Sequence, residues 1–139
     1  MKILVLNGVN INMTGSREAI YGTESLDEIN AKLKDIAQSS GAEIEFFLSN
    51  SEGEIVDRLQ AGGFDGLIIN AGAYTHYSYA IADALSCVKA KTVEVHLTNI
   101  LAREEFRQKS VLAKHTVGCI AGFGGDSYIL ALRYLLCER

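Results

Sequence analysis

The chain has 139 residues, of which 48% are apolar and 22% are charged, and its formal net charge is −4 at pH 7. This length suits one compact domain over residues 1–139 and excludes a barrel of eight βα units, which needs roughly 250 residues. The apolar fraction and the small net charge exclude a disordered chain. The longest apolar runs fall far short of the ~20 residues of a membrane-spanning helix, so we expect no membrane partner. The mildly acidic chain also lacks a run of lysine or arginine, so we expect no nucleic-acid partner.

The three cysteines, Cys87, Cys119 and Cys137, are widely spaced and include no C-x-x-C pair. Such a pattern is typical neither of a disulfide framework nor of a zinc site. The three histidines likewise lack the i, i+4 spacing of a metal-binding helix. We therefore predict a reducing, cytoplasmic location and no bound metal.

Apolar runs alternate along the chain with helical patterns. Residues 3–6 form a continuous apolar run, which is typical of a strand buried on both faces. Ser25 and Glu28 then form a capping box in front of apolar residues at helical spacing, which predicts a helix that ends near Gly41. Residues 44–48 predict a second strand.

The same alternation continues to the end of the sequence. A second helix is predicted after Ser51, and Gly62 and Gly63 close it. The remaining predicted elements are a strand at residues 66–69, a helix at 77–88, strands at 92–97 and 116–121, and a closing helix at 127–136. Five such βα repeats predict an α/β fold with a doubly wound, five-stranded parallel sheet in three layers.

Ligands of doubly wound sheets bind beyond the carboxyl ends of the strands. With the strand order 2-1-3-4-5, Asn10, Asn70 and His96 stand at or just beyond the ends of three neighbouring strands and are expected to converge. Two long segments without a periodic pattern, residues 10–23 and 99–114, are the candidate functional loops.

The fourth predicted strand alternates in polarity, which places Glu94, His96 and Thr98 on one of its faces. A parallel sheet usually buries both faces, so a glutamate and a histidine there need a reason. We favour the hypothesis that Glu94 holds the imidazole in one tautomer and favours its protonated form, so that His96 acts as a general acid. The alternative is a structural ion pair, in which Glu94 and His96 only satisfy each other's hydrogen bonds at the end of the strand.

Arg17 and Tyr21 lie on the first long loop, which could close over a ligand. A guanidinium beside a phenol favours the phenolate, so these residues could form a base and its activator. The alternative is a solvated arginine and a tyrosine that packs on the loop, and the loop position alone favours it.

Four further residues have both a functional and an ordinary interpretation. His76 precedes the third predicted helix and Asp83 lies two turns into it, and either could contact a ligand or fill an ordinary structural role. Arg103 and Arg107 stand one helical turn apart, which suits a ligand with a carboxylate, but they could equally pair with Glu104 on the surface.

Taken together, these residues resemble the type II 3-dehydroquinate dehydratases. The resemblance runs nearly from end to end and rests on the motifs LNGVN (6–10), RE (17–18), YG (21–22), SNSEG (49–53), NAGAYTH (70–76), EVHLTN (94–99) and REEFR (103–107). Each motif alone is weak, but the set is highly specific.

The resemblance implies a flavodoxin-like fold and the anti elimination of water from 3-dehydroquinate to give 3-dehydroshikimate. The reaction belongs to the shikimate pathway of aromatic amino acid biosynthesis and proceeds through an enolate without a metal or another cofactor. Tyr21, activated by Arg17, is expected to remove the proton beside the ketone. Asn10, acting through a water, is expected to stabilise the enolate oxygen, and His96, oriented by Glu94, to protonate the departing hydroxyl.

The resemblance also implies how the substrate is held. The implied contacts are the backbone amides of Leu97 and Thr98 for the carboxylate, and Asn70, His76 and Arg107 for the hydroxyl groups. Asp83 is implied to reach the site of an adjacent subunit, in a trimer that assembles further into a dodecamer.

The chain departs from the family pattern at Val9, Ala19 and Ala71, where proline is usual, and its loop between Arg17 and Tyr21 is one residue shorter. Three missing φ restraints beside the site predict a less preorganised site. A phosphotransfer receiver module, an FMN-binding flavodoxin and an inactive relative of the enzyme have the same fold and are the alternative functions.

Overall fold

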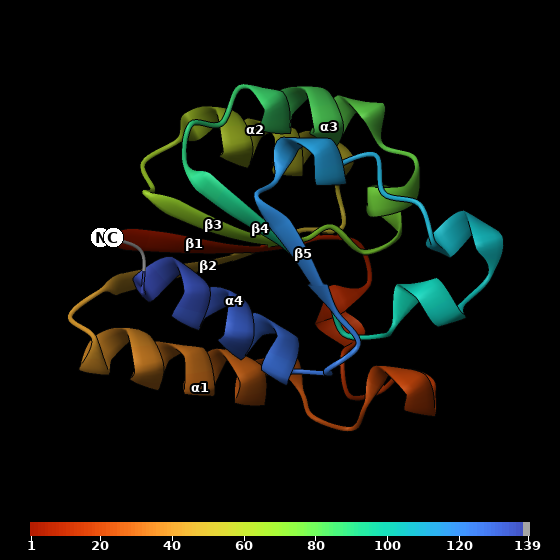
Figure 1. The fold of residues 1–139 in the computed structure, drawn as a ribbon, viewed down its shortest axis with the longest axis horizontal. Helices are drawn as coiled ribbons and strands as arrows, with labels where there is room; N and C mark the ends of the chain where they lie inside the picture. Colours follow the sequence, from red (N-terminus) through yellow and green to blue (C-terminus); the bar gives the residue numbers. More distant parts are fainter. Residues whose placement is uncertain (138–139) are drawn as a thin grey trace.

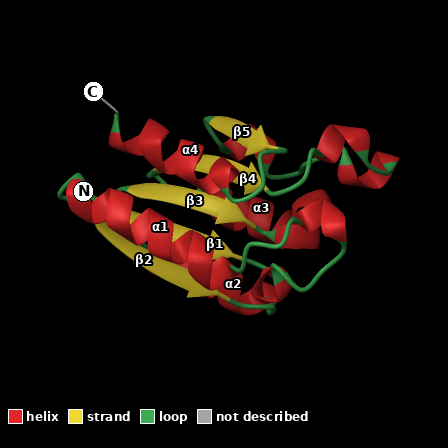
Figure 2. Cartoon of the chain, turned by 90° about the horizontal axis from the view of Figure 1, so that it is seen from below, coloured by secondary structure: helices red, strands yellow, loops and turns green. Residues whose placement is uncertain are grey.

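The computed structural model describes residues 1–137, and a five-stranded parallel sheet forms its centre. The strands are β1 (Lys2–Asn7), β2 (Glu43–Leu48), β3 (Gly66–Asn70), β4 (Lys91–His96) and β5 (Gly118–Ala121). Their order is β2-β1-β3-β4-β5, which confirms the predicted flavodoxin-like topology. Because every neighbouring pair is parallel, all carboxyl ends lie at one edge of the sheet, towards which the arrows point in Figure 2.

Four α-helices cover the two faces of the sheet (Figure 1). One face is covered by α1 (Leu26–Ser39) and α4 (Asp126–Leu136), and the other by α2 (Glu52–Ala61) and α3 (Tyr79–Ser86). Ile3 and Val5 of β1 belong to the apolar core under α1 and α4, whereas Leu4 and Leu6 belong to the core under α2 and α3. The continuous apolar run of the first strand therefore fills two cores at once.

None of the helices in residues 1–137 has the length and apolar character needed to cross a lipid bilayer.

Three serine side chains set where the helices begin. Ser25 accepts a hydrogen bond from the backbone N–H of Glu28 at 3.1 Å, and Ser51 caps α2 in the same way. Ser78, a cap that was not predicted, accepts a hydrogen bond from the N–H of Ile81 at 3.1 Å at the start of α3. The third helix therefore begins at Tyr79 and not at the predicted residue 77.

The connection between β4 and β5 differs from the prediction of five βα repeats. In the described residues this crossover holds only short 3₁₀ turns, at Ile100–Ala102, Glu105–Arg107 and Ala113–His115, and no α-helix. Since these turns bury little, the segment has no apolar stripe that could pack a helix on the sheet. The repeat count was therefore wrong for this crossover, although the candidate functional loop at residues 99–114 is confirmed as irregular.

Candidate active site

A cleft of ≈ 470 Å³, open solvent at its mouth included, lies beyond the carboxyl ends of β1, β3 and β4. This is the edge at which doubly wound sheets bind ligands. Most of the predicted site residues line it, namely Asn10, Arg17, Tyr21, Asn70, His76, His96, Leu97, Thr98 and Arg107, together with Arg103. Glu94 lies buried behind His96, and Asp83 lies elsewhere.

Two glycines let the loops after β1 and β3 touch. The N–H of Gly8 donates to the carbonyl of Asn70 at 2.8 Å. A Cβ atom on Gly8 would lie 2.4 Å from the carbonyl oxygen of Ala71, and one on Gly72, whose φ is +64°, would lie 2.4 Å from that of Val9. Larger residues would force these loops apart, so the two glycines bring the ends of neighbouring strands together at the cleft.

Asn10 has a left-handed backbone conformation with a φ of 67°, which among residues 1–137 it shares only with glycines. Asparagine tolerates this conformation better than most residues, and its backbone N–H is held by Oδ1 of Asn50 at 2.9 Å. Strained backbone of this kind is concentrated at functional sites. The conformation therefore supports a functional role for Asn10, which lines the cleft.

Glu94 and His96 form the expected pair on one face of β4. The carboxylate is fully buried, and its Oε1 lies 2.6 Å from Nε2 of His96. An ionised carboxylate can only accept, so Nε2 carries a proton and Nδ1 is the ring nitrogen left for a ligand. Val93 and Val95, which alternate with these residues, belong to the core under α1 and α4, as the alternation predicts.

Ser110 fixes the other oxygen of Glu94 and was not predicted. Its hydroxyl donates to Oε2 of Glu94 at 2.9 Å and accepts from the N–H groups of Leu112 and Ala113. The loop after β4 thus returns to hold the carboxylate that holds His96. No spacing signal could have found Ser110, because it lies in an irregular loop 16 residues after Glu94.

Two guanidinium groups lie against the ring of Tyr21, which is only 9% exposed. The Cζ atom of Arg17 is 3.8 Å from the ring centroid, and that of Arg103 is 4.9 Å from it. Arg17 and Tyr21 are therefore in contact, and their roles as activator and base stay a prediction. The contact with Arg103 was not predicted, because the sequence suggested only a ligand carboxylate or a surface pairing with Glu104 for this residue.

His76 is held as a neutral imidazole beside His96. Nδ1 of His76 donates to the carbonyl of Lys109 at 2.7 Å, and the two imidazole rings stack with their centroids 6.3 Å apart. Burial lowers the pKa of His76 from 6.5, the hydrogen bond to Lys109 opposes this, and the nearby charges of His96 and Arg107 lower it further. Nε2 of His76 is therefore an acceptor at neutral pH.

Part of the hydrogen-bonding capacity of the Asn70 side chain is used within the protein. Its Nδ2 donates to the hydroxyl of Tyr128 at 2.7 Å, and that hydroxyl donates in turn to Oδ1 of Asn7. Oδ1 of Asn70 accepts from the N–H of Gly72 at 3.2 Å. Burial raises the pKa of Tyr128, which keeps its hydroxyl a donor. One N–H and one lone pair of the Asn70 amide remain for a ligand.

Arg103 and Arg107 do not share a helix, so the reasoning from helical spacing was wrong. Arg103 follows one 3₁₀ turn and Arg107 ends the next. Both nevertheless line the cleft. Nε of Arg107 also lies 2.9 Å from a carboxylate oxygen of Glu104, so the predicted pairing with Glu104 exists as well.

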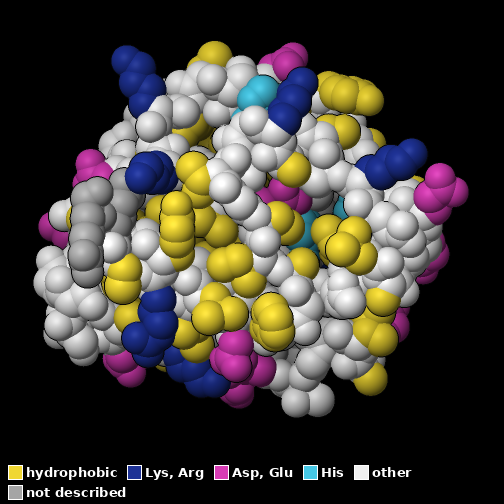
Figure 3. All heavy atoms as spheres, in the orientation of Figure 1, with side chains coloured by type: hydrophobic (Ala, Val, Ile, Leu, Met, Phe, Trp, Pro, Cys, Tyr) yellow, Lys and Arg dark blue, Asp and Glu magenta, His cyan; other side chains and the backbone are white. Residues whose placement is uncertain are grey.

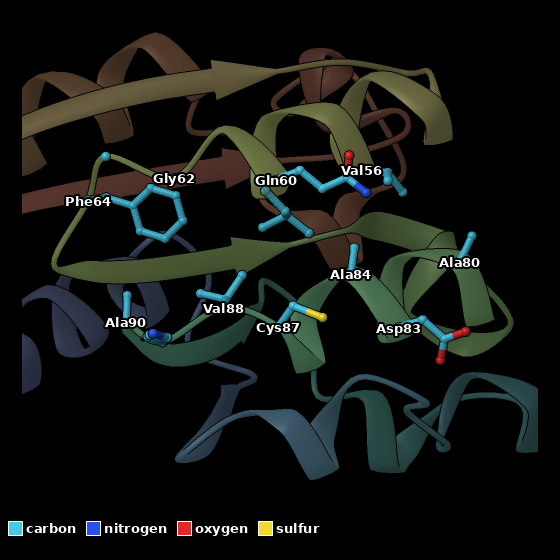
Figure 4. A pocket seen from close by; sticks show the side chains of 13 residues that line it. Val56, Gln60, Gly62, Phe64, Ala80, Asp83, Ala84, Cys87, Val88 and Ala90 are labelled. Carbon is cyan, nitrogen blue, oxygen red and sulfur yellow. The ribbon is translucent and has the colours of Figure 1, made fainter.

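Asp83 lies outside the cleft of its own chain. It is exposed on α3 and lines a separate groove between α2 and α3, together with Val56, Phe64 and Cys87 (Figure 4). The chain by itself therefore does not bring Asp83 to the other predicted site residues.

Comparison with known proteins identifies the family. The model of the family described as dehydroquinase class II matches residues 1–136. The 3-dehydroquinate dehydratase of Thermotoga neapolitana is 54% identical to this chain and that of Geotalea daltonii 57% identical, with 97% and 96% of this chain and 94% of each relative covered.

Solved structures agree with this match. The type II dehydroquinase from Butyrivibrio crossotus has a TM-score of 0.94 at 46% identity, with 97% of both chains covered. A 3-dehydroquinate dehydratase-like protein from Bifidobacterium longum has a TM-score of 0.71 at 28% identity, with 99% of both chains covered. The chain therefore belongs to the class II dehydroquinase family.

Proposed function

We propose that the cleft dehydrates 3-dehydroquinate to 3-dehydroshikimate by anti elimination through an enolate, as a step of the shikimate pathway. Membership of the family makes the chain a hydro-lyase. The observation that carries the mechanism is a tyrosine held against two guanidinium groups in the same cleft as a histidine held by a buried glutamate. Such a pair can supply the base and the acid of an elimination.

Tyr21 is the base that removes the proton beside the ketone. The positive charge of Arg17, whose guanidinium lies against the ring, favours negative charge on the phenol oxygen. Arg103 acts in the same direction. Asn10, through a water, stabilises the enolate oxygen that develops.

His96 is the acid that protonates the departing hydroxyl. Glu94 orients its ring, and Ser110 orients Glu94. The backbone amides of Leu97 and Thr98, just beyond the end of β4, bind the substrate carboxylate. The hydroxyl groups of the substrate are bound by Asn70, His76 and Arg107, all of which line the cleft.

The active protein is a homo-oligomer, a trimer that assembles further into a dodecamer. The position of Asp83 supports this proposal, because it is exposed on a separate groove although the family resemblance assigns it a substrate contact. A neighbouring subunit would bring Asp83 to a cleft that its own chain cannot reach.

Residues 1–139 form one catalytic domain, of which residues 138 and 139 lie outside the described part. The single sheet supports this proposal. The protein works in the cytoplasm, a location that its three free cysteines support.

The test is to mix the purified protein with 3-dehydroquinate and to follow the ultraviolet absorbance of the conjugated enone product. We expect the absorbance to rise, and to rise equally after treatment with borohydride in the presence of substrate, because no lysine imine forms. Loss of activity after borohydride would contradict the enolate route. No rise in absorbance, with an intact fold and a bound substrate analogue, would identify an inactive relative of the enzyme.

A further inference from the structure

Glu94, His96 and Cys119 form a cluster of potential metal ligands. A carboxylate oxygen, a ring nitrogen and the cysteine sulfur all lie within 4.8 Å of one another. Cys119 is paired with Glu94 in the register between β4 and β5, and in a sheet such neighbours project their side chains from the same face. His96 lies two residues after Glu94 and shares that face. The pairing of β4 with β5 thus brings the three residues together. They do not have the short sequence spacing of a helical or C-x-x-C metal site.

The three donor types are those that zinc prefers. Bonds to zinc of about 2.0 to 2.3 Å in a tetrahedral arrangement place neighbouring ligand atoms roughly 3.3 to 3.6 Å apart. The three ligand atoms lie within 4.8 Å of one another, and Oε1 of Glu94 is 2.6 Å from Nε2 of His96, so the ligand atoms surround a space of this size and must adjust to reach the tetrahedral spacing. A carboxylate and a thiolate neutralise the two positive charges of the ion, and three protein ligands leave a fourth position for water.

The thiol is the accessible member of the cluster. Cys119 is exposed and belongs to β5, which is the edge strand of the sheet and lies towards the viewer in Figure 1. Glu94 and His96 are buried. In Figure 3, histidine atoms are visible recessed between other side chains on this same side of the molecule. An ion can therefore meet the sulfur first and then the two inner ligands.

We propose that Glu94, His96 and Cys119 bind Zn²⁺ and that the bound ion inhibits the enzyme. Binding releases the proton of the Cys119 thiol to solvent. Nε2 of His96, which faces Glu94, also gives up its proton, Nδ1 takes up a proton from solvent, and the lone pair freed on Nε2 binds the ion. A zinc-bound imidazole cannot be doubly protonated, so His96 loses the form that serves as the acid. The inhibitory part rests on the proposed function, but the binding site does not.

The experiment uses the full chain, the variant Cys119→Ser and the matched control Cys87→Ser, which removes a different exposed thiol. Co²⁺ is titrated in place of Zn²⁺, because a cobalt–thiolate bond gives a near-ultraviolet charge-transfer band. We expect one such site in the unmodified protein and in Cys87→Ser, and no band in Cys119→Ser. Circular dichroism verifies the fold, and Cys119→Ala serves as a second variant.

Dehydratase activity is then measured against increasing Zn²⁺. We expect Cys119→Ser to be as active as the unmodified protein without metal and to need at least roughly tenfold more Zn²⁺ for half-inhibition, since even the loss of a residue that only orients a metal ligand costs about 10- to 100-fold in affinity. A chelator should restore activity in all three proteins. Equal sensitivity of Cys119→Ser and the unmodified protein, or a cobalt band that survives this substitution, would overturn the proposal. A normal band in a protein without dehydratase activity would sink the proposed function and leave the metal site standing.

Discussion

In the proposed mechanism the hydroxyl of Tyr21 removes the proton, and two arginines lie against the ring of this residue. Arg17 comes from the same loop, four residues away, and Arg103 comes from the loop after β4. Cation–π contacts of this kind contribute about 0.5 to 2 kcal/mol each. The ring is therefore positioned independently of its hydroxyl, and the two can be separated by substitution.

We expect Tyr21→Phe to lower kcat at least ~100-fold, the usual contribution of a general base. Binding of a substrate analogue and the free energy of unfolding should change little, because the ring and its arginine contacts remain. Steady-state kinetics and calorimetry check this result. Tyr134→Phe, at an exposed position on α4, is the matched control and should retain full activity. Unchanged turnover of Tyr21→Phe would show that another group is the base.

His76 makes stability depend on pH, because burial lowers its pKa below 6.5. Between this lowered value and 6.5 the unfolded chain binds more protons than the folded chain, so stability falls as the pH falls through this window. We expect the free energy of unfolding to drop less between pH 7.5 and pH 5.5 in His76→Gln than in the unmodified protein. Urea titrations at both pH values measure the difference, and His115→Gln is the histidine control. The same pH dependence in His76→Gln would contradict the assignment.

The sequence predicts the Glu94–His96 pair because the alternation that creates it is local to one strand. It cannot predict that Ser110 holds Glu94 or that Arg103 lies against Tyr21. Both contacts depend on the course of the irregular loop after β4, and no periodic pattern in the sequence predicts that course.

At the scale of elements, capping residues at helix ends predict the observed structure better than the sequence of an irregular loop does. Ser25 and Ser51 are capping residues that can be recognised from the few residues beside them, and both caps form as predicted. The crossover between β4 and β5 consists of 3₁₀ turns of three residues, which are too short to leave an apolar period in the sequence.

The loop that carries Arg17 and Tyr21 can be stiffened at Ala19. This residue begins the short turn Ala19–Tyr21, a position where the N–H has no partner within the turn and proline is favoured. Glu18 before it is extended, with a ψ of 151°, as a residue before proline must be. We expect Ala19→Pro to raise the free energy of unfolding by about 0.4 to 1 kcal/mol and to lower KM, since less loop entropy is lost on binding.

Ile20→Pro is the matched control for this substitution. Ile20 is 59% exposed, so its replacement costs no core packing. A proline there disfavours the helical conformation of Ala19, and we expect lower stability and a higher KM. Urea denaturation and substrate titration measure both variants. Identical effects of the two prolines would mean that the turn at residues 19–21 does not preorganise the cleft.

At the scale of the whole molecule, the order of the strands brings the residues that line the cleft together. Because β1, β3 and β4 are neighbours, residues far apart in the sequence, such as Asn10 and His96, meet at one edge. Asp83 is the predicted site residue that this arrangement does not gather, since α3 presents it in a groove on the α2 side. The proposed substrate contact of Asp83 would therefore require a second chain.

Subunit mixing tests this requirement directly. Tyr21→Phe and Asp83→Asn should each be strongly impaired alone, whereas Asp57→Asn, at an exposed position on α2, should be active. We expect mixed oligomers from co-expression of the two impaired chains to regain activity, because some sites combine Tyr21 of one chain with Asp83 of its neighbour. Random assembly into cyclic trimers gives about a quarter of such sites. Mixed oligomers no more active than their parents would mean that Asp83 serves only its own chain, and that α3 must move to bring it to the cleft.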